Sequence, residues 1–284
     1  QGSSSAFVPS LYLSNVMSLA PKIDEIRHLA NYANVDCICI TETWLKCHIH
    51  DNVIALDGFN LVRKDRAVID HGGICAFIRN EINFTVLHDT EDKNFEVLWI
   101  KLRPTRLPRG FSSIVLGIVY HPPSANDLEI LHYLHNRLSS IESNFHNCGL
   151  LLVGDFNRLN ITSLRTSHSL KQLVKFPTRG TRTLDLILTN LYDFYKDPIQ
   201  FPPHGLSDHM SIKISPKDRS QLRTPRFTIK SRDLKPSNRL AMRTYLQEVD
   251  VVGLVTAANT CAEKSATLEN IIQTGMDATL PLRS

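Results

Sequence analysis

Leu151-Leu152-Val153-Gly154-Asp155-Phe156-Asn157 is the stretch that decides the fold and points to the chemistry. Its apolar half is typical of a buried strand, and its Gly-Asp-Phe-Asn half breaks the strand and leaves polar side chains at the end of a sheet. Metal and phosphate chemistry is commonly built at such strand ends. Alone, Gly-Asp-x-Asn is more often a simple turn, so Asp155 and Asn157 become site candidates only in combination with other residues.

Further polar side chains end other predicted strands. They are Asn15, Glu42, Tyr120, Asp185, Asp208 and His209. Asp185 is the hardest to explain by packing, because an acid within the apolar stretch 184–188 must find a partner or face a cavity. His209 is the natural partner for it. Carboxylates that converge with amides, a tyrosine and a histidine make a hard-oxygen site that suits Mg²⁺ or Mn²⁺, and phosphodiester cleavage needs the same groups.

The order of the predicted elements indicates the fold class. Apolar runs bounded by turn residues predict strands over 7–16, 35–40, 59–62, 73–78, 82–87, 95–102, 113–120, 149–153, 184–188 and 210–214. Two amphipathic helices are predicted, one opened by Pro21 and one capped by Asp127. Many strands, few helices and mixed connections favour an α+β protein in which helical layers lie outside two packed sheets.

The composition is that of an ordinary globular protein, with 284 residues of which 42% are apolar. That length allows one large domain, or one domain with a tail. The six cysteines include no Cys-x-x-Cys pair, which favours buried thiols in a reducing compartment over a zinc site. The chain has no apolar run of membrane-span length, and its start does not resemble a secretory signal. We therefore expect a nuclear or cytoplasmic protein that is not secreted and has no membrane partner.

A basic segment follows the predicted strands. Residues 217–243 hold nine lysines and arginines and two aspartates, a net charge of +7, whereas the remainder of the chain carries −3. Such a segment fits contact with a polyanion and equally fits a solvated linker. We expect a disordered N-terminus over 1–7, one domain over 8–215, a basic proline-containing linker over 216–238 and a helical segment over 239–284. The last segment is open to interpretation as a truncated piece of a neighbouring module.

In this order the motifs resemble the endonuclease/exonuclease/phosphatase superfamily, which includes DNase I and the apurinic endonucleases, over about residues 8–215. The likeness is closest to the endonuclease domain of LINE-type (non-LTR) retrotransposons. The stretches that carry it include Thr41-Glu42-Thr43-Trp44-Leu45, Tyr120-His121-Pro122-Pro123, Phe176-Pro177-Thr178-Arg179, Leu184-Asp185-Leu186-Ile187-Leu188-Thr189-Asn190 and Ser207-Asp208-His209.

The resemblance implies a DNase I-like four-layer αββα sandwich, in which helices flank two packed mixed β-sheets. It also implies a Mg²⁺-dependent endonuclease, with Mn²⁺ as a possible substitute, that nicks double-stranded DNA and leaves a 3′-hydroxyl and a 5′-phosphate. In such retrotransposons the 3′-hydroxyl primes reverse transcription, so a C-terminal reverse transcriptase in a longer parent polyprotein is an implied partner. The oligomeric state is left open.

Metal binding and water activation are assigned to five residues by the resemblance. Glu42 is the principal metal ligand, helped by Asn15, and Asp208 binds or steers a metal. Asp155 orients and deprotonates the attacking water, while Asn157 holds water or phosphate.

Recognition of the phosphate is assigned to five others. His209 donates a hydrogen bond to the scissile phosphate, and Asp185 fixes the tautomer and charge of that histidine. Tyr120 hydrogen-bonds the phosphate. Ser207 and Thr178 are weaker candidates for contact with the substrate.

Three positions depart from the family pattern. Pro123 stands where apurinic endonucleases usually carry an asparagine, and Met17 stands where they usually carry an aspartate. Both make a dedicated base-excision enzyme less expected. His71 takes one place in a glycine-rich turn that is usually longer in retrotransposon relatives.

Two alternatives to a DNA endonuclease stay open. Because fold does not determine substrate, a phosphatase or phosphodiesterase acting on lipid or nucleotide phosphates would carry the same motifs. A relic of a mobile element that binds DNA without cutting it, or is inert, is the second alternative. The basic segment and the stretch 184–190 favour DNA. Target-site preference and the number of metals do not follow from the sequence.

Overall fold

The structure is a computed structural model that describes residues 8–66, 71–88, 94–217 and 231–283. The chain divides into two compact units, Gln1–Leu222 and Arg223–Ser284. The predicted disordered N-terminus and positions 218–230 of the predicted linker lie outside the described residues. The domain boundaries proposed from the sequence therefore stay predictions.

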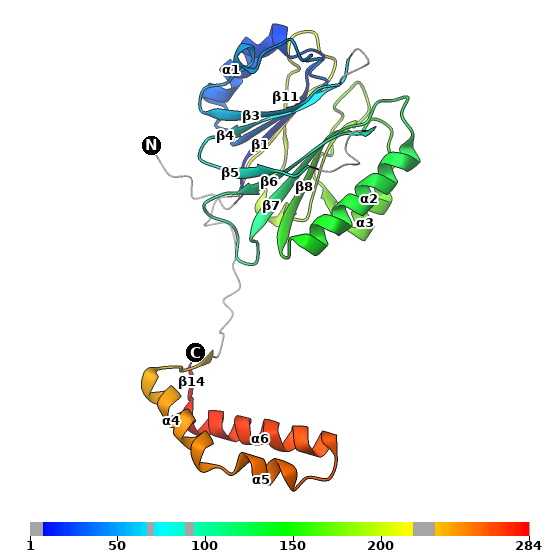
Figure 1. Ribbon diagram of the computed structural model, residues 1–284. Helices are drawn as coiled ribbons and strands as arrows, with labels where there is room; N and C mark the ends of the chain where they lie inside the picture. Colours follow the sequence, from blue (N-terminus) through cyan, green and yellow to red (C-terminus); the bar gives the residue numbers. More distant parts are fainter. Residues whose placement is uncertain (1–7, 67–70, 89–93, 218–230, 284) are drawn as a thin grey trace. The chain divides into compact units, whose positions relative to one another are not determined.

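The first unit contains two six-stranded sheets that face each other (Figure 1). The strand order of the first sheet is β11 (Ile199–Phe201), β12 (Ser211–Ile214), β1 (Leu11–Asn15), β2 (Cys37–Thr41), β4 (Ile74–Arg79) and β3 (Phe59–Lys64). The strand order of the second sheet is β5 (Asn83–Val86), β6 (Glu96–Arg103), β7 (Ser113–Tyr120), β8 (Cys148–Asp155), β10 (Asp185–Thr189) and β9 (Lys171–Gln172). β1 runs parallel to β2 and β7 runs parallel to β8, whereas the other described neighbours are antiparallel, so both sheets are mixed.

Alternate residues of the central strands make the core between the sheets. Leu151 and Val153 of β8 lie in this core together with Leu13 of β1 and Cys39 of β2. The intervening β8 residues pack instead against α2 (Asp127–Asn144). Because β8 is buried on both faces, its sequence is continuously apolar, which is the pattern that predicts such a strand.

Helices cover the outer faces of the sheet pair (Figure 1). α1 (Ile23–Tyr32) buries Ile26 and Leu29 against the outer face of the first sheet. α2 and α3 (Thr162–Ser167) pack on the outer face of the second sheet. The layers run helix, sheet, sheet, helix, and the predicted four-layer αββα arrangement is confirmed. Short 3₁₀ helices occur at η1 (Ala20–Lys22), η2 (Asp51–Val53) and η4 (Tyr192–Phe194).

The start of α2 differs from the prediction. Asn126 caps this helix, because its side-chain oxygen accepts hydrogen bonds from the backbone N–H groups of Leu128 and Glu129. Asp127 is the first helical residue, and its carboxylate lies 2.7 Å from Nε2 of His121. No prediction covers β9, β11 or α3, which are two, three and six residues long and too short to show a period.

The second unit is mainly helical. Its elements are β13 (Ser231–Arg232), α4 (Pro236–Glu248), α5 (Val251–Thr256), α6 (Cys261–Thr279) and β14 (Leu282–Arg283). α6 begins with a capping box, in which the side chains of Thr260 and Glu263 each accept a hydrogen bond from the other residue's backbone N–H. Among the described helices, none combines the length and the apolar character that a membrane span requires.

Gly154 is a point of close approach between β8 and β7. Its φ is +140°, and a Cβ atom added to it would lie 1.9 Å from the carbonyl oxygen of Val119. We expect Gly154→Ala to lower the free energy of unfolding of the first unit by roughly 2–4 kcal/mol, because the backbone has to move. Urea denaturation followed by tryptophan fluorescence measures this unit, because Trp44 and Trp99 both lie in it.

Gly58→Ala is the matched control for this substitution. Gly58 also has a positive φ, +79°, but nothing lies within 4 Å of an added Cβ. We expect Gly58→Ala to lower the free energy of unfolding by only about 1–2 kcal/mol, which is the cost of placing a residue with a side chain in a left-handed backbone conformation. Equal losses in the two variants would contradict the steric role of Gly154.

Candidate functional site

The ends of the central strands deliver polar side chains to one edge of the space between the sheets. Asp155 lies two residues after Val153 on the inward face of β8, and it is paired in register with Tyr120 of β7 and Asp185 of β10. Asn15 ends β1 in the facing sheet. Because side chains alternate along a strand, these terminal residues point the same way as the core residues two positions away in the same strand, which for Asp185 is the following Ile187.

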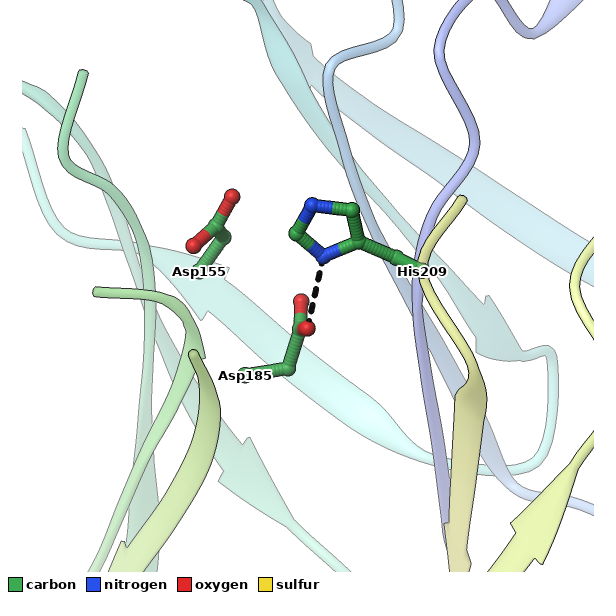
Figure 2. A group of neighbouring side chains, drawn as sticks. All are labelled: Asp155, Asp185 and His209. Carbon is green, nitrogen blue, oxygen red and sulfur yellow. Dashed lines mark hydrogen bonds and ion pairs between the residues drawn. The ribbon is translucent and has the colours of Figure 1, made fainter. Parts of the chain in front are cut away.

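Asp155, Asp185 and His209 form a buried cluster (Figure 2). Nδ1 of His209 lies 2.7 Å from Oδ2 of Asp185, which is the partnership that the sequence predicts for this acid. One ligand atom from each of the three residues lies within 4.8 Å of the others. The second oxygen of Asp185, Oδ1, is buried without a hydrogen-bond partner among the described residues. The bond at Nδ1 leaves Nε2 of His209 for another group.

Asn15 links this cluster to the loop that follows β2. Its Nδ2 atom donates to Oδ2 of Asp155 and to Oε1 of Glu42, each at 3.0 Å. The indole N–H of Trp44 donates to the other Glu42 oxygen at 3.1 Å. Glu42 and Trp44 have φ angles of 51° and 53°, a conformation that costs free energy in residues with side chains. No role for Trp44 follows from the sequence, where its only signal is its place in the Thr-Glu-Thr-Trp stretch.

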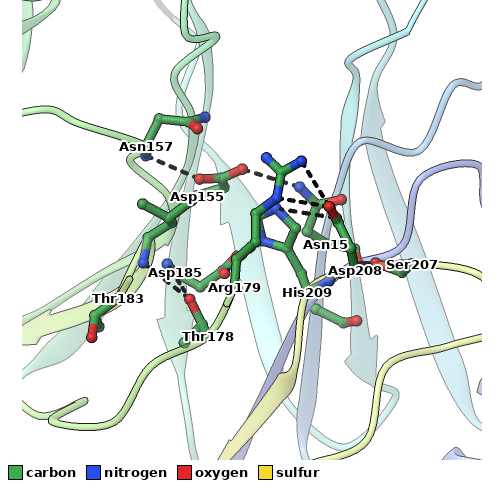
Figure 3. A network of polar contacts seen from close by, with 12 residues as sticks. Asn15, Asp155, Asn157, Thr178, Arg179, Thr183, Asp185, Ser207, Asp208 and His209 are labelled. Atoms are coloured by element: carbon green, nitrogen blue, oxygen red, sulfur yellow. Dashed lines mark hydrogen bonds and ion pairs between the residues drawn. The ribbon is translucent and has the colours of Figure 1, made fainter. Parts of the chain in front are cut away.

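Asn157 steadies Asp155 from the same strand end (Figure 3). Its backbone N–H donates to Oδ1 of Asp155 at 3.0 Å, and its side chain donates to the backbone carbonyl of His121 at 2.8 Å. With the contact from Asn15, both oxygens of Asp155 therefore accept hydrogen bonds. The polar break after β8 is thus a turn that also orients a carboxylate.

Thr178 and Ser207 use their hydroxyl groups within the protein (Figure 3). The Thr178 hydroxyl accepts from the backbone N–H of Asp185 at 3.1 Å, and the Ser207 hydroxyl donates to the carbonyl of Asn15 at 2.6 Å. Both residues are buried. These contacts hold the backbone around the cluster, while contact of either residue with substrate stays a prediction.

Asp208 lies beside the cluster and pairs with Arg179 (Figure 3). Its Oδ2 accepts from Nε of Arg179 at 2.8 Å and lies 2.7 Å from the Nη2 atom. Its Oδ1 lies 3.8 Å from Nε2 of His209. About half of each side chain in the pair is exposed. The sequence assigns no role to Arg179, because the pair forms only where the turn after Thr178 meets a separate loop.

The surroundings of the cluster shift its proton affinities. Burial, with the charges of Glu42 and Asp155, raises the pKa of Tyr120 above its usual value, so its hydroxyl stays protonated and able to donate. Burial also raises the pKa of Asp155 to about 7, and the charge of Asp185 acts in the same direction. Burial alone would lower the pKa of His209, but the hydrogen bond and charge of Asp185, with the other carboxylates, raise it.

The donor set fits a divalent cation. Glu42, Asp155 and Asp185 bring carboxylates toward one edge of the sheets, and Asn15 adds an amide. Carboxylates held together out of water repel each other, and a bound cation relieves that repulsion. The unpartnered Oδ1 of Asp185 is a further oxygen whose burial a cation would compensate.

A groove of about 690 Å³ opens beside the cluster. Asn157 and Asp208 line it, together with Arg158, Arg179 and Arg182, and all three arginines are exposed. An open groove with three guanidinium groups suits a polyanionic ligand. The groove therefore adds a basic surface beside the cluster.

Several solved structures share this fold. The AP endonuclease LMAP from Leishmania major aligns with a TM-score of 0.57 at 16% identity, over 72% of this chain and 86% of that one. The endonuclease domain of TRAS1, a telomere-specific non-LTR retrotransposon, aligns with a TM-score of 0.57 at 11% identity, over 76% and 100%. A mannosyl-6-phosphatase from Bacteroides thetaiotaomicron aligns with a TM-score of 0.52 at 13% identity, over 73% and 99%.

These identities show a common fold and no more. No curated protein sequence matches the chain significantly. Residues 12–209 match the profile of the Endonuclease/Exonuclease/phosphatase family, and this span contains every side chain of the cluster. The chain therefore belongs to the Endonuclease/Exonuclease/phosphatase family.

Proposed function

We propose that the first unit is a Mg²⁺-dependent DNA endonuclease that hydrolyses one phosphodiester bond and leaves a 3′-hydroxyl and a 5′-phosphate. The observation that carries the proposal is the buried cluster of Asp155, Asp185 and His209. In this cluster a base, Asp155, and a hydrogen-bond donor, His209, lie close enough together to contact the same phosphate group. The cluster also lies beside a groove lined by arginines. Phosphodiester hydrolysis requires these parts together.

In the proposed reaction a water molecule attacks phosphorus in line, and Asp155 accepts its proton. The contacts from Asn15 and Asn157 aim the Asp155 carboxylate at that water. His209 donates from Nε2 to a non-bridging phosphate oxygen in its doubly protonated form, which Asp185 stabilises through Nδ1. The P–O3′ bond breaks, and the 3′-oxygen takes a proton from solvent.

Glu42, helped by Asn15, would hold the cation. A bound Mg²⁺ would neutralise charge on the phosphate as it develops. Tyr120 keeps its proton and would hydrogen-bond the same phosphate. Asp208 already forms an ion pair with Arg179. To steer the metal as proposed, its carboxylate would have to interact with the cation while it keeps this ion pair.

The groove favours DNA as the substrate. Arg158 and Arg182 line it, and a nucleic-acid backbone offers successive phosphates to such side chains. The TRAS1 domain, which shares the fold, is an endonuclease domain of a non-LTR retrotransposon. We therefore propose that the nick serves target-site cleavage by such an element, with a reverse transcriptase as a partner in a longer polyprotein.

Loss of the base should abolish most of the activity. We expect Asp155→Asn to lower the rate of supercoiled plasmid nicking by roughly 10²–10⁴-fold, the size of general acid–base effects. The same assay with EDTA should show no nicking. Asp57→Asn, an exposed acid outside the site, is the matched control and should nick at the wild-type rate. Undiminished nicking by Asp155→Asn would remove Asp155 from the mechanism.

The pH profile should report the charge of His209. The raised pKa of His209 keeps the ring protonated, so activity should decline at alkaline pH as the proton leaves. Because Asp185 stabilises the protonated ring, Asp185→Asn should move the alkaline limb of the kcat/KM profile to lower pH. Nicking rates from about pH 5 to about pH 10 measure this limb. A limb that stays in place would contradict the proposed role of Asp185, and His88→Asn, an exposed histidine, serves as the control.

The shared fold of the mannosyl-6-phosphatase makes a small phosphoester the alternative substrate. We expect plasmid DNA to be preferred over a sugar 6-phosphate, a phosphoinositide and a nucleoside monophosphate, each tested with Mg²⁺. Replacing Arg158 and Arg182 by alanine should raise KM for DNA and leave hydrolysis of small phosphates unchanged. Preferred hydrolysis of a small phosphate, untouched by these substitutions, would favour the phosphatase. DNA binding without nicking would favour an inactive relic.

A further inference from the structure

A second group of imidazoles lies away from the candidate active site, between α2 and the end of α3. Nδ1 of His135, on α2, lies 3.3 Å from Nε2 of His168, which follows α3. The ring centroids are 5.3 Å apart. His168 is only 6% exposed, whereas His135 is partly buried. The proposed hydrolysis uses neither ring.

The outward nitrogen of each ring has its own polar partner. Nδ1 of His168 lies 2.8 Å from Oε2 of Glu142, and Nε2 of His135 lies 3.1 Å from the hydroxyl of Ser163. Because a carboxylate accepts hydrogen bonds, the proton of His168 belongs at Nδ1, and its Nε2 presents a lone pair toward His135. When His135 donates from Nε2 to Ser163, its Nδ1 presents a lone pair in return.

Two facing lone pairs at this separation match the geometry of a bound metal. Two imidazole nitrogens on a tetrahedral Zn²⁺, each at 2.0–2.1 Å, lie about 3.3 Å apart. The observed 3.3 Å between Nδ1 of His135 and Nε2 of His168 equals that separation, and it also lies within hydrogen-bond distance. A histidine that binds a metal also commonly donates its other N–H to a carboxylate, as His168 does to Glu142.

We propose that His135 and His168 form a second metal site, which binds a borderline d-block cation such as Zn²⁺ or Cu²⁺ through Nδ1 and Nε2. Among the described residues, the one group of three or more potential ligands in mutual reach is the active-site cluster. The second site therefore has two protein ligands, and water completes the coordination. Imidazole ligands favour these cations over Mg²⁺, so the two sites select different metals.

The site would fasten α3 to α2. α3 is six residues long and buries one side chain, Leu164, so it has little packing of its own. It follows closely after Asn157, which holds Asp155 in place. A cation shared between His135 and His168 would thus stabilise the segment that follows the candidate active site.

Copper binding to the full chain tests this site. The background carries His209→Asn, which removes the imidazole of the active-site cluster. We expect one tightly bound equivalent of Cu²⁺ whose electron paramagnetic resonance spectrum shows coupling to two imidazole nitrogens. His135→Asn and His168→Asn should each remove this species, whereas His132→Asn, an exposed histidine on the same helix, should retain it.

Glu142→Gln provides a variant that leaves both ligands in place. Glu142 is substantially exposed, so the substitution should preserve folding, and it should weaken Cu²⁺ binding by about 10–100-fold. Zn²⁺ should raise the Tm of the parent chain and of His132→Asn, and should leave the Tm of His135→Asn unchanged. Copper uptake that persists in His135→Asn and His168→Asn, or that is lost equally in His132→Asn, would overturn the proposal.

Discussion

One amide group joins the two sheets at the candidate site. The Nδ2 atom of Asn15 donates to the carboxylate of Glu42, after the first sheet, and to that of Asp155, at the end of the second. Both acceptors are carboxyl groups, and this one donor holds an oxygen atom of each. The packing of the two sheets brings the strand ends close together. The hydrogen bonds from the Asn15 amide then fix the positions of the two carboxylates relative to each other. The cluster of Asp155, Asp185 and His209 is built on this bridge.

Backbone conformation at the strand ends contributes to the same arrangement. Met17, Ser18, Glu42, Trp44 and Asn157 all have positive φ angles, and they follow β1, β2 and β8. Non-glycine residues adopt this conformation at a cost of roughly 1–3 kcal/mol each when surrounding contacts hold them there. The free energy of the packed sheets offsets that cost. The strain is concentrated where the chain must turn from a core strand to a site residue.

Much of the fold could be predicted from local patterns in the sequence. A strand buried on both faces reads as a continuous apolar run, and 151–153 followed by Gly154-Asp155 marks both the strand and its end. The partnership of Asp185 with His209 was also readable, because an acid inside an apolar strand requires a partner. The four layers follow from the number and order of such strands, and the structure confirms them.

Contacts between side chains on separate segments could not be predicted in the same way. Arg179 meets Asp208 where two loops pack side by side, and His135 meets His168 where α2 packs beside the end of α3. No period or motif in the sequence encodes such a meeting. The cap of α2 illustrates a subtler limit, because Asn126 and Asp127 are both good capping residues and only backbone geometry decides between them.

The strand order has a consequence for synthesis of the protein. β12, near the end of the first unit, pairs with β1 at its beginning, and the Ser207 hydroxyl reaches the carbonyl of Asn15 across 192 positions. During translation β1 therefore leaves the ribosome together with its neighbour β2 but long before its other neighbour, β12, has been made. Until His209 and β12 have emerged, the growing polypeptide lacks both the β12 side of its first sheet and the imidazole of the cluster, so the cluster assembles only late in the translation of this unit.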